Sequence, residues 1–145
     1  MSASTSSRIE QHPDIMALRD HSERAAANPV AQMAEALGIL CGVYLAASPW
    51  IVGFEGFTTL RVNNLITGLA IALLLGGLGS AAYERTHAMS WAALCLGAWT
   101  IVAPWVVSGA VDTTRTITSN VIVGGVTCLA ALALAGMGVA GRRRV

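Results

Sequence analysis

The sequence predicts an all-α fold: a four-helix transmembrane bundle made of two parallel helix-hairpin repeats, preceded by a short cytoplasmic or interfacial N-terminal helix. Three observations predict it. The chain of 145 residues is 54% hydrophobic and only 12% charged, whereas a soluble domain carries about 25% charged residues. It contains four uncharged stretches of membrane-spanning length. Its two halves also match each other in register.

The first predicted element is a short helix within a cytoplasmic N-terminal segment, residues 1–30. The first eight residues are small and polar, so we expect them to be disordered. Ile15 and Leu18 are the only large apolar anchors in the regular part of the weakly amphipathic helical pattern that follows. The helix lies either on the membrane surface or in solution, and the sequence leaves both open. Asn28-Pro29 ends it, because asparagine before proline favours an extended or capping conformation.

The next four elements are the uncharged stretches. They cover residues 36–54, 62–83, 88–111 and 116–141. Each has roughly the 20 residues that a helix needs to cross about 30 Å of hydrocarbon. We therefore expect two hairpin repeats, residues 34–83 and 88–141, and a basic cytoplasmic tail at 142–145.

Arginine distribution predicts the orientation of the bundle. Seven of the nine arginines lie in the N-terminal segment, the middle connection and the tail, while Arg61 and Arg115 lie in the other two connections. The side richer in arginine is normally cytoplasmic. We expect a multi-pass protein of the plasma membrane with both termini in the cytoplasm.

An internal repeat supplies the candidate functional residues. Its first part aligns Ser48-Pro49-Trp50 with Ala103-Pro104-Trp105 at one constant offset. Its second part, after one extra residue in the second copy, aligns Asn64 and Gly68 with Asn120 and Gly124. A proline-tryptophan pair repeated in register with Asn-x-x-x-Gly is unlikely to arise by chance.

These repeated motifs resemble the SPW repeat family of small bacterial membrane proteins, which is named for the tripeptide at Ser48-Pro49-Trp50. The resemblance covers about residues 34–140. It departs from the pattern at Ala103, so any role of the Ser48 hydroxyl is not shared by both halves. The resemblance implies a membrane location and a repeat architecture, but no established activity.

The repeated prolines predict two bends. Each removes a backbone donor and frees the carbonyl four residues earlier, at Leu45 and Thr100. The paired kink either improves packing or opens a small vestibule, and Ser48 is a candidate local partner for the first freed carbonyl. The adjacent Trp50 and Trp105 either form an interfacial aromatic belt or face each other as a clamp for a quinone, a lipid tail or a cation.

The repeated asparagines are interpreted first as helix N-caps, with Gly68 and Gly124 as close packing contacts four residues later. The alternative is a hydrogen bond from each asparagine to the carbonyl freed by the proline of the preceding helix. That bond would tie each hairpin together.

No catalytic, cofactor-binding or metal-ligating set of residues is evident, so we do not expect an enzyme or a cofactor. A redox enzyme using Cys41 or Cys95 is the weakest alternative. The expected partners are membrane lipids and either a membrane protein or a second copy of the chain, and not nucleic acid.

The activity itself is not evident from the sequence. We expect a non-catalytic scaffold or accessory membrane subunit. The alternative is a small transporter or channel, or a lipid- or quinone-binding protein, that uses the kinked Pro-Trp helices.

Overall fold

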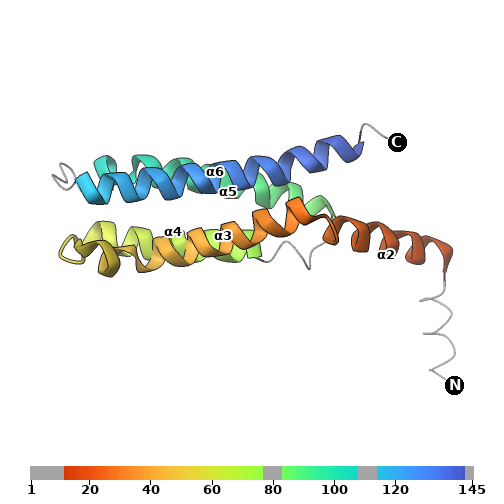
Figure 1. The fold of residues 1–145 in the computed structure, drawn as a ribbon, viewed down its shortest axis with the longest axis horizontal. Helices are drawn as coiled ribbons and strands as arrows, with labels where there is room; N and C mark the ends of the chain where they lie inside the picture. Colours follow the sequence, from red (N-terminus) through yellow and green to blue (C-terminus); the bar gives the residue numbers. More distant parts are fainter. Residues whose placement is uncertain (1–11, 77–82, 108–113, 143–145) are drawn as a thin grey trace, which may run out of the picture.

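Every element that the structure describes is a helix. The structure is a computed structural model that describes residues 12–76, 83–107 and 114–142 (Figure 1). The elements in chain order are α2 (Pro13–Ala26), α3 (Pro29–Ser48), the π-helical turn η1 (Pro49–Gly53), α4 (Thr58–Gly76), α5 (Tyr83–Val107) and α6 (Thr114–Arg142). Four spans are long and apolar enough to cross a membrane. The predicted all-α four-helix bundle is confirmed, whereas the disorder expected for the first eight residues lies outside the described part.

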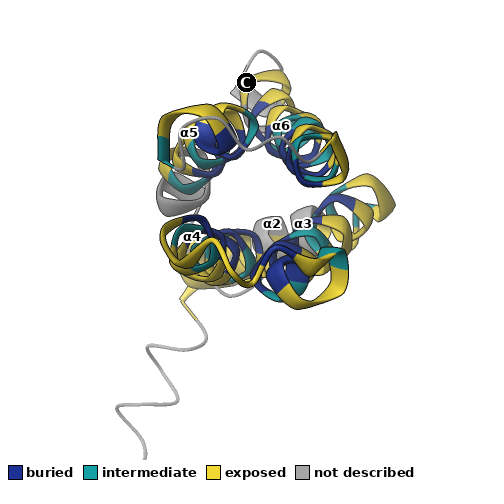
Figure 2. Cartoon of the chain, turned by 90° about the vertical axis from the view of Figure 1, so that its left-hand side faces the viewer, coloured by how far each residue is buried: buried dark blue, intermediate teal, exposed yellow. Residues whose placement is uncertain are grey.

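The four long helices form a ring of two antiparallel hairpins. In the view along the bundle, α3 lies next to α4 and α6, and α5 lies next to the same two helices (Figure 2). The equivalent helices α3 and α5 therefore stand at opposite corners, as do α4 and α6. This arrangement is the one expected for two parallel repeats related by an axis along the bundle.

The helices begin before the apolar stretches that predict them. The α3 helix starts at Pro29, where the Asn28 side chain accepts a hydrogen bond from the backbone N–H of Val30 at 3.0 Å. Asn28 thus caps the next helix as well as ending α2. The α5 helix includes the polar residues 84–87, which we expected to form a connection. The reason is that hydropathy marks the part of a helix suited to hydrocarbon, while the hydrogen-bonded helix extends beyond it.

The interior of the bundle combines a few large apolar side chains with many small and polar ones, whereas most large apolar side chains lie on the outer surface. Leu45, Ile71 and Leu75 are fully buried together with several alanines. Large side chains such as Leu40 and Leu73 are more than half exposed on the outer surface, where Figure 2 shows most of the exposed residues. Small inward faces let membrane helices approach closely, and the outer apolar surface matches lipid.

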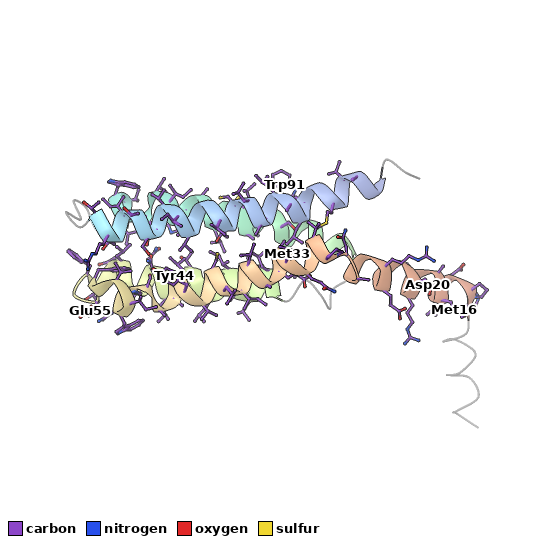
Figure 3. The ribbon with its side chains drawn as sticks, in the orientation of Figure 1. Met16, Asp20, Met33, Tyr44, Glu55 and Trp91 are labelled. Carbon is purple, nitrogen blue, oxygen red and sulfur yellow. The ribbon has the colours of Figure 1, made fainter. Side chains whose placement is uncertain are left out.

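The α2 helix stands apart from this body. It contacts α3 only near its end and runs away from the end of the bundle rather than across it (Figure 1). Met16 and Asp20 on this helix lie beyond the end of the bundle (Figure 3).

Candidate functional site

The centre of the bundle holds a pair of buried asparagines, one from each repeat. Asn64 on α4 and Asn120 on α6 are both completely buried. The Asn64 amide nitrogen donates to Asn120 Oδ1 at 3.0 Å, and the Asn120 amide nitrogen donates to Asn64 Oδ1 at 3.3 Å. The two side chains thus form a reciprocal amide pair that joins the two hairpins.

Ser48 extends this pair to the first proline. Its hydroxyl donates to the Leu45 carbonyl at 2.7 Å and accepts from the Asn64 amide nitrogen at 3.2 Å. Leu45 is the residue whose carbonyl Pro49 leaves without its usual helical donor. The predicted contribution of Ser48 at the first bend is confirmed.

The second copy of the repeat also supplies a donor to the carbonyl freed by its proline, but without a serine. The Asn120 amide nitrogen donates directly to the Thr100 carbonyl at 3.4 Å. Thr100 stands four residues before Pro104, so this is the second freed carbonyl. Ala103 aligns with Ser48 in the repeat, and the asparagine replaces the missing hydroxyl as the donor.

The interpretation of the asparagines as N-caps is wrong. The α4 helix begins at Thr58 and α6 at Thr114, so Asn64 and Asn120 lie in the second turn of their helices, inside the bundle. The alternative interpretation, a bond to the freed carbonyl, is confirmed directly for Asn120. For Asn64 the bond runs through the Ser48 hydroxyl.

The two repeated prolines lie in different kinds of helix, and the paired kink stays a prediction. Pro49 begins the π-helical turn η1, in which the Phe54 backbone N–H bonds to the Pro49 carbonyl at 2.9 Å. Pro104 instead lies inside α5, which stays α-helical to Val107. Within the described residues, only the first copy changes helix type, and its turn ends at Gly53, which has a positive φ of 88°.

The repeated glycines bring the helices of each hairpin into close contact. A Cβ atom on Gly68 would lie 2.5 Å from the Gly42 carbonyl oxygen, and one on Gly124 would lie 2.7 Å from the Gly97 carbonyl oxygen. Gly42 and Gly97 are themselves aligned in the repeat. The predicted packing role of Gly68 and Gly124 is therefore confirmed, and each has an equivalent glycine opposite it.

The tryptophans of the motif face outward. Trp50 is 57% exposed and Trp105 is 50% exposed. The clamp between them is therefore wrong, because both indole rings lie on the outer surface rather than opposite each other inside. Their positions fit the aromatic belt, in which the ring lies at the membrane interface.

The comparison with protein families agrees with this repeated geometry. The model of the SPW repeat domain matches residues 32–134, which includes both proline-tryptophan pairs and both asparagine-glycine pairs. The chain belongs to the SPW repeat family. No curated protein and no solved structure matches it. In this SPW protein, the serine and proline of the motif belong to the hydrogen-bonded centre, whereas the tryptophan marks the outside of the same helix.

Sequence reasoning missed a second layer of contacts between the SPW repeats. The Tyr44 hydroxyl lies 3.3 Å from Ser119 Oγ, and the Trp99 indole N–H donates to Asn63 Oδ1 at 2.9 Å. Tyr44 aligns with Trp99, and Ser119 with Asn63. A search for polar residues directly before each repeated asparagine would have found this pair of contacts.

The central cluster consists of amide, hydroxyl and carbonyl groups, which form hydrogen bonds but do not ionise near neutral pH. Among the buried side-chain polar atoms of the described residues, Thr116 Oγ1 has no hydrogen-bond partner. The cysteines are free thiols in different surroundings: Cys41 packs against the core, whereas Cys95 is exposed. The chemistry of the centre is therefore suited to holding helices together.

Proposed function

We propose that this SPW protein is a non-catalytic scaffold or accessory subunit of a membrane complex. In this role the two repeats form a stable transmembrane body, and α2 is the docking element for a partner. The observation that supports it best is the use of the repeated polar residues. Asn64, Asn120 and Ser48 bond to one another and to the freed backbone carbonyls.

Helix packing supports the same role. The contacts at Gly42 with Gly68, and at Gly97 with Gly124, leave no space for a Cβ atom between the helices of either hairpin. A transporter would need a polar path between the repeats. At the level of the asparagine pair, buried side chains fill the space between the repeats where such a path would run.

The shape and composition of α2 support docking. The helix extends beyond the bundle (Figure 1), and its apolar side chains Met16 and Leu18 are 56% and 70% exposed. Charged residues precede and follow them along the helix, namely Asp14, Arg19, Asp20, Glu23 and Arg24. Such a mixed surface suits a polar interface with a protein, and a helix that leaves the bundle along its axis is placed to reach one outside the lipid.

Orientation is part of the proposal. In the sequence, the N-terminal segment, the connection at residues 84–87 and the C-terminal tail carry seven of the nine arginines, which favours the cytoplasm for both termini. A fusion of green fluorescent protein to the C-terminus is expected to fluoresce, and a fusion of alkaline phosphatase there is expected to be inactive. An active phosphatase fusion would reverse the assignment and place α2 outside the cell.

Site-specific photo-crosslinking in cells tests the docking role. A photoreactive amino acid at Leu18 is expected to give a discrete crosslinked product with another protein. The matched control is Val43, which is 55% exposed on α3 and faces lipid in the proposed arrangement. If neither Leu18 nor Met16 gives a protein adduct, and the gently extracted protein migrates alone, the scaffold role is wrong.

The second candidate is a small transporter or channel, or a lipid- or quinone-binding protein. It is favoured by the π-helical turn at Pro49, because π-helical segments often occur at functional sites. The unpartnered Thr116 hydroxyl inside the bundle is a second polar group available to a passing solute. Solute flux into vesicles that contain the purified protein, abolished by Thr116→Val, would favour this candidate over the scaffold.

A further inference from the structure

An open groove lies on the outside of the bundle where the two repeats meet. It has a volume of about 480 Å³, within the roughly 300–1,000 Å³ typical of small-ligand sites. One wall comes from α3 and η1, and the other from the first turns of α6. The residues that line it are Tyr44, Ile51, Val52, Thr114, Arg115, Thr118, Ser119 and Ile122. In Figure 3, Tyr44 marks its position on α3, between Met33 and the Glu55 end of the bundle.

The lining combines one cation, several hydroxyl groups and an apolar surface. Arg115 is exposed at the end of the bundle, and Thr118 and Ser119 follow one helical turn deeper. Ile122 lies one further turn along α6, about 10 Å from Arg115 at 1.5 Å per residue. None of the described residues that line the groove is acidic. A ligand that matches this lining carries an anionic, oxygen-rich group at one end and a hydrocarbon chain at the other.

The repeat provides an internal comparison for this groove. On the opposite side of the bundle, α5 and α4 meet in the equivalent way. There Thr59 stands in the position of Arg115, and Val62 in that of Thr118. The equivalent face also carries the larger Trp99 ring bonded to Asn63, where the groove has Tyr44 and Ser119. The cation and the additional hydroxyl are therefore specific to one of two similar surfaces, and packing of the repeats does not require them.

We propose that this groove binds one anionic phospholipid. The lipid phosphate pairs with the Arg115 guanidinium and accepts hydrogen bonds from the Thr118 and Ser119 hydroxyl groups. One acyl chain lies along Ile51 and Ile122. Charge complementarity supports the headgroup, since guanidinium binds phosphate oxygens through two parallel hydrogen bonds. The apolar walls support the chain, because the groove opens to the part of the surface that faces lipid. This site is independent of the proposed scaffold role.

Native mass spectrometry of the full-length protein in detergent tests the site. The probes are dioleoylphosphatidylglycerol, dioleoylphosphatidylcholine and sn-glycerol 3-phosphate. We expect one phosphatidylglycerol molecule to remain bound when phosphatidylcholine dissociates. Arg115→Gln is expected to weaken its retention about fivefold to tenfold. The matched control is Arg61→Gln, because Arg61 lies at the same end of the bundle, where its guanidinium donates to the Glu55 carbonyl at 3.2 Å. This control is expected to retain the lipid.

A second variant tests the groove itself. Ile122 is 59% exposed, so Ile122→Trp is expected to fold, fill the apolar part of the groove and displace the lipid although Arg115 is present. Equal retention of the two lipids, or equal losses in the Arg115 and Arg61 variants, would overturn the proposal. The proposal would also be wrong if both Arg115→Gln and Ile122→Trp retained phosphatidylglycerol as well as the unchanged protein does. Displacement of phosphatidylglycerol by millimolar glycerol phosphate would assign the site to a free phosphate instead.

Discussion

A carboxamide inside a membrane bundle must find hydrogen-bond partners within the protein, because hydrocarbon offers none. Asn64 and Asn120 do so with each other, and both donors of each amide are used. Each pair member also supports a carbonyl that the nearby proline has freed, directly or through Ser48. The asparagines and prolines of the repeat therefore depend on each other: the proline creates a free acceptor, and the asparagine supplies the donor.

Replacement of the asparagines tests this dependence. Asn64→Ala and Asn120→Ala each leave a buried amide without its partner, and each is expected to lower the free energy of unfolding by about 1–3 kcal/mol. The double variant is expected to lose less than the sum of the two. The coupling should be about 1 kcal/mol, as for hydrogen bonds between membrane helices. Reversible unfolding in mixed detergent measures all four proteins. Strict additivity of the two losses would show that the amide pair contributes nothing as a pair.

Ser48 offers a milder test at the same centre. The second repeat has alanine at this position, and there the asparagine reaches the freed carbonyl directly. Ser48→Ala is therefore expected to cost less than about 1 kcal/mol, because Asn64 can take the arrangement already adopted by Asn120. Asn120→Ala, which removes the side-chain donor to the Thr100 carbonyl, is the more damaging change. If Ser48→Ala and Asn120→Ala unfold at the same denaturant concentration, Asn64 does not take over the role of the Ser48 hydroxyl, and the prediction is wrong.

At the scale of the helices, close packing within each hairpin depends on a glycine opposite a glycine. Gly124 and its neighbour Gly125 provide a matched pair. A Cβ atom at Gly124 would lie 2.7 Å from the Gly97 carbonyl oxygen, whereas one at Gly125 would meet nothing within 4 Å. Gly124→Ala should lower the free energy of unfolding by about 1–3 kcal/mol, because α5 and α6 must separate.

The neighbouring substitution gives the control. Gly125→Ala should leave the stability unchanged or raise it by up to about 1 kcal/mol, because alanine is the better helix former. The same unfolding measurement compares the two. Equal effects of the two substitutions would mean that helix propensity, and not the contact with Gly97, determines the stability of this hairpin.

The helices and the repeat could be predicted from the sequence, since both depend on local composition and on register. The boundaries could not be predicted so well. Asn64 stands at a polar-to-apolar transition that resembles a helix start, but α4 begins earlier, at Thr58, and includes the polar residues before Asn64. Both prolines are followed by tryptophan and a β-branched residue, yet only Pro49 begins a π-helical turn. Contacts such as Tyr44 with Ser119 depend on which helices are adjacent, which hydropathy does not reveal.

At the scale of the whole molecule, the two hairpins are held together differently from the helices within each hairpin. Inside a hairpin, glycines allow the backbones to touch. Between hairpins, polar side chains bond across the interface: the asparagine pair at the centre, and Tyr44 with Ser119 and Trp99 with Asn63 on its two sides. The pseudo-symmetric molecule therefore has the construction of a dimer of hairpins joined by one connection.

This construction predicts that the connection between the hairpins is not needed for their association. Residues 1–80 and 81–145, produced as separate chains in one cell, should insert as two hairpins and assemble, because membrane helices first insert and then associate. An affinity tag on the first chain should recover the second in about equal amount. Asn120→Ala should reduce the recovery, since it removes the central amide pair. Gly125→Ala should not, since a Cβ atom there meets no neighbour. Recovery of the tagged chain alone, with both chains present in the membrane, would show that covalent connection and not the polar interface holds the repeats together.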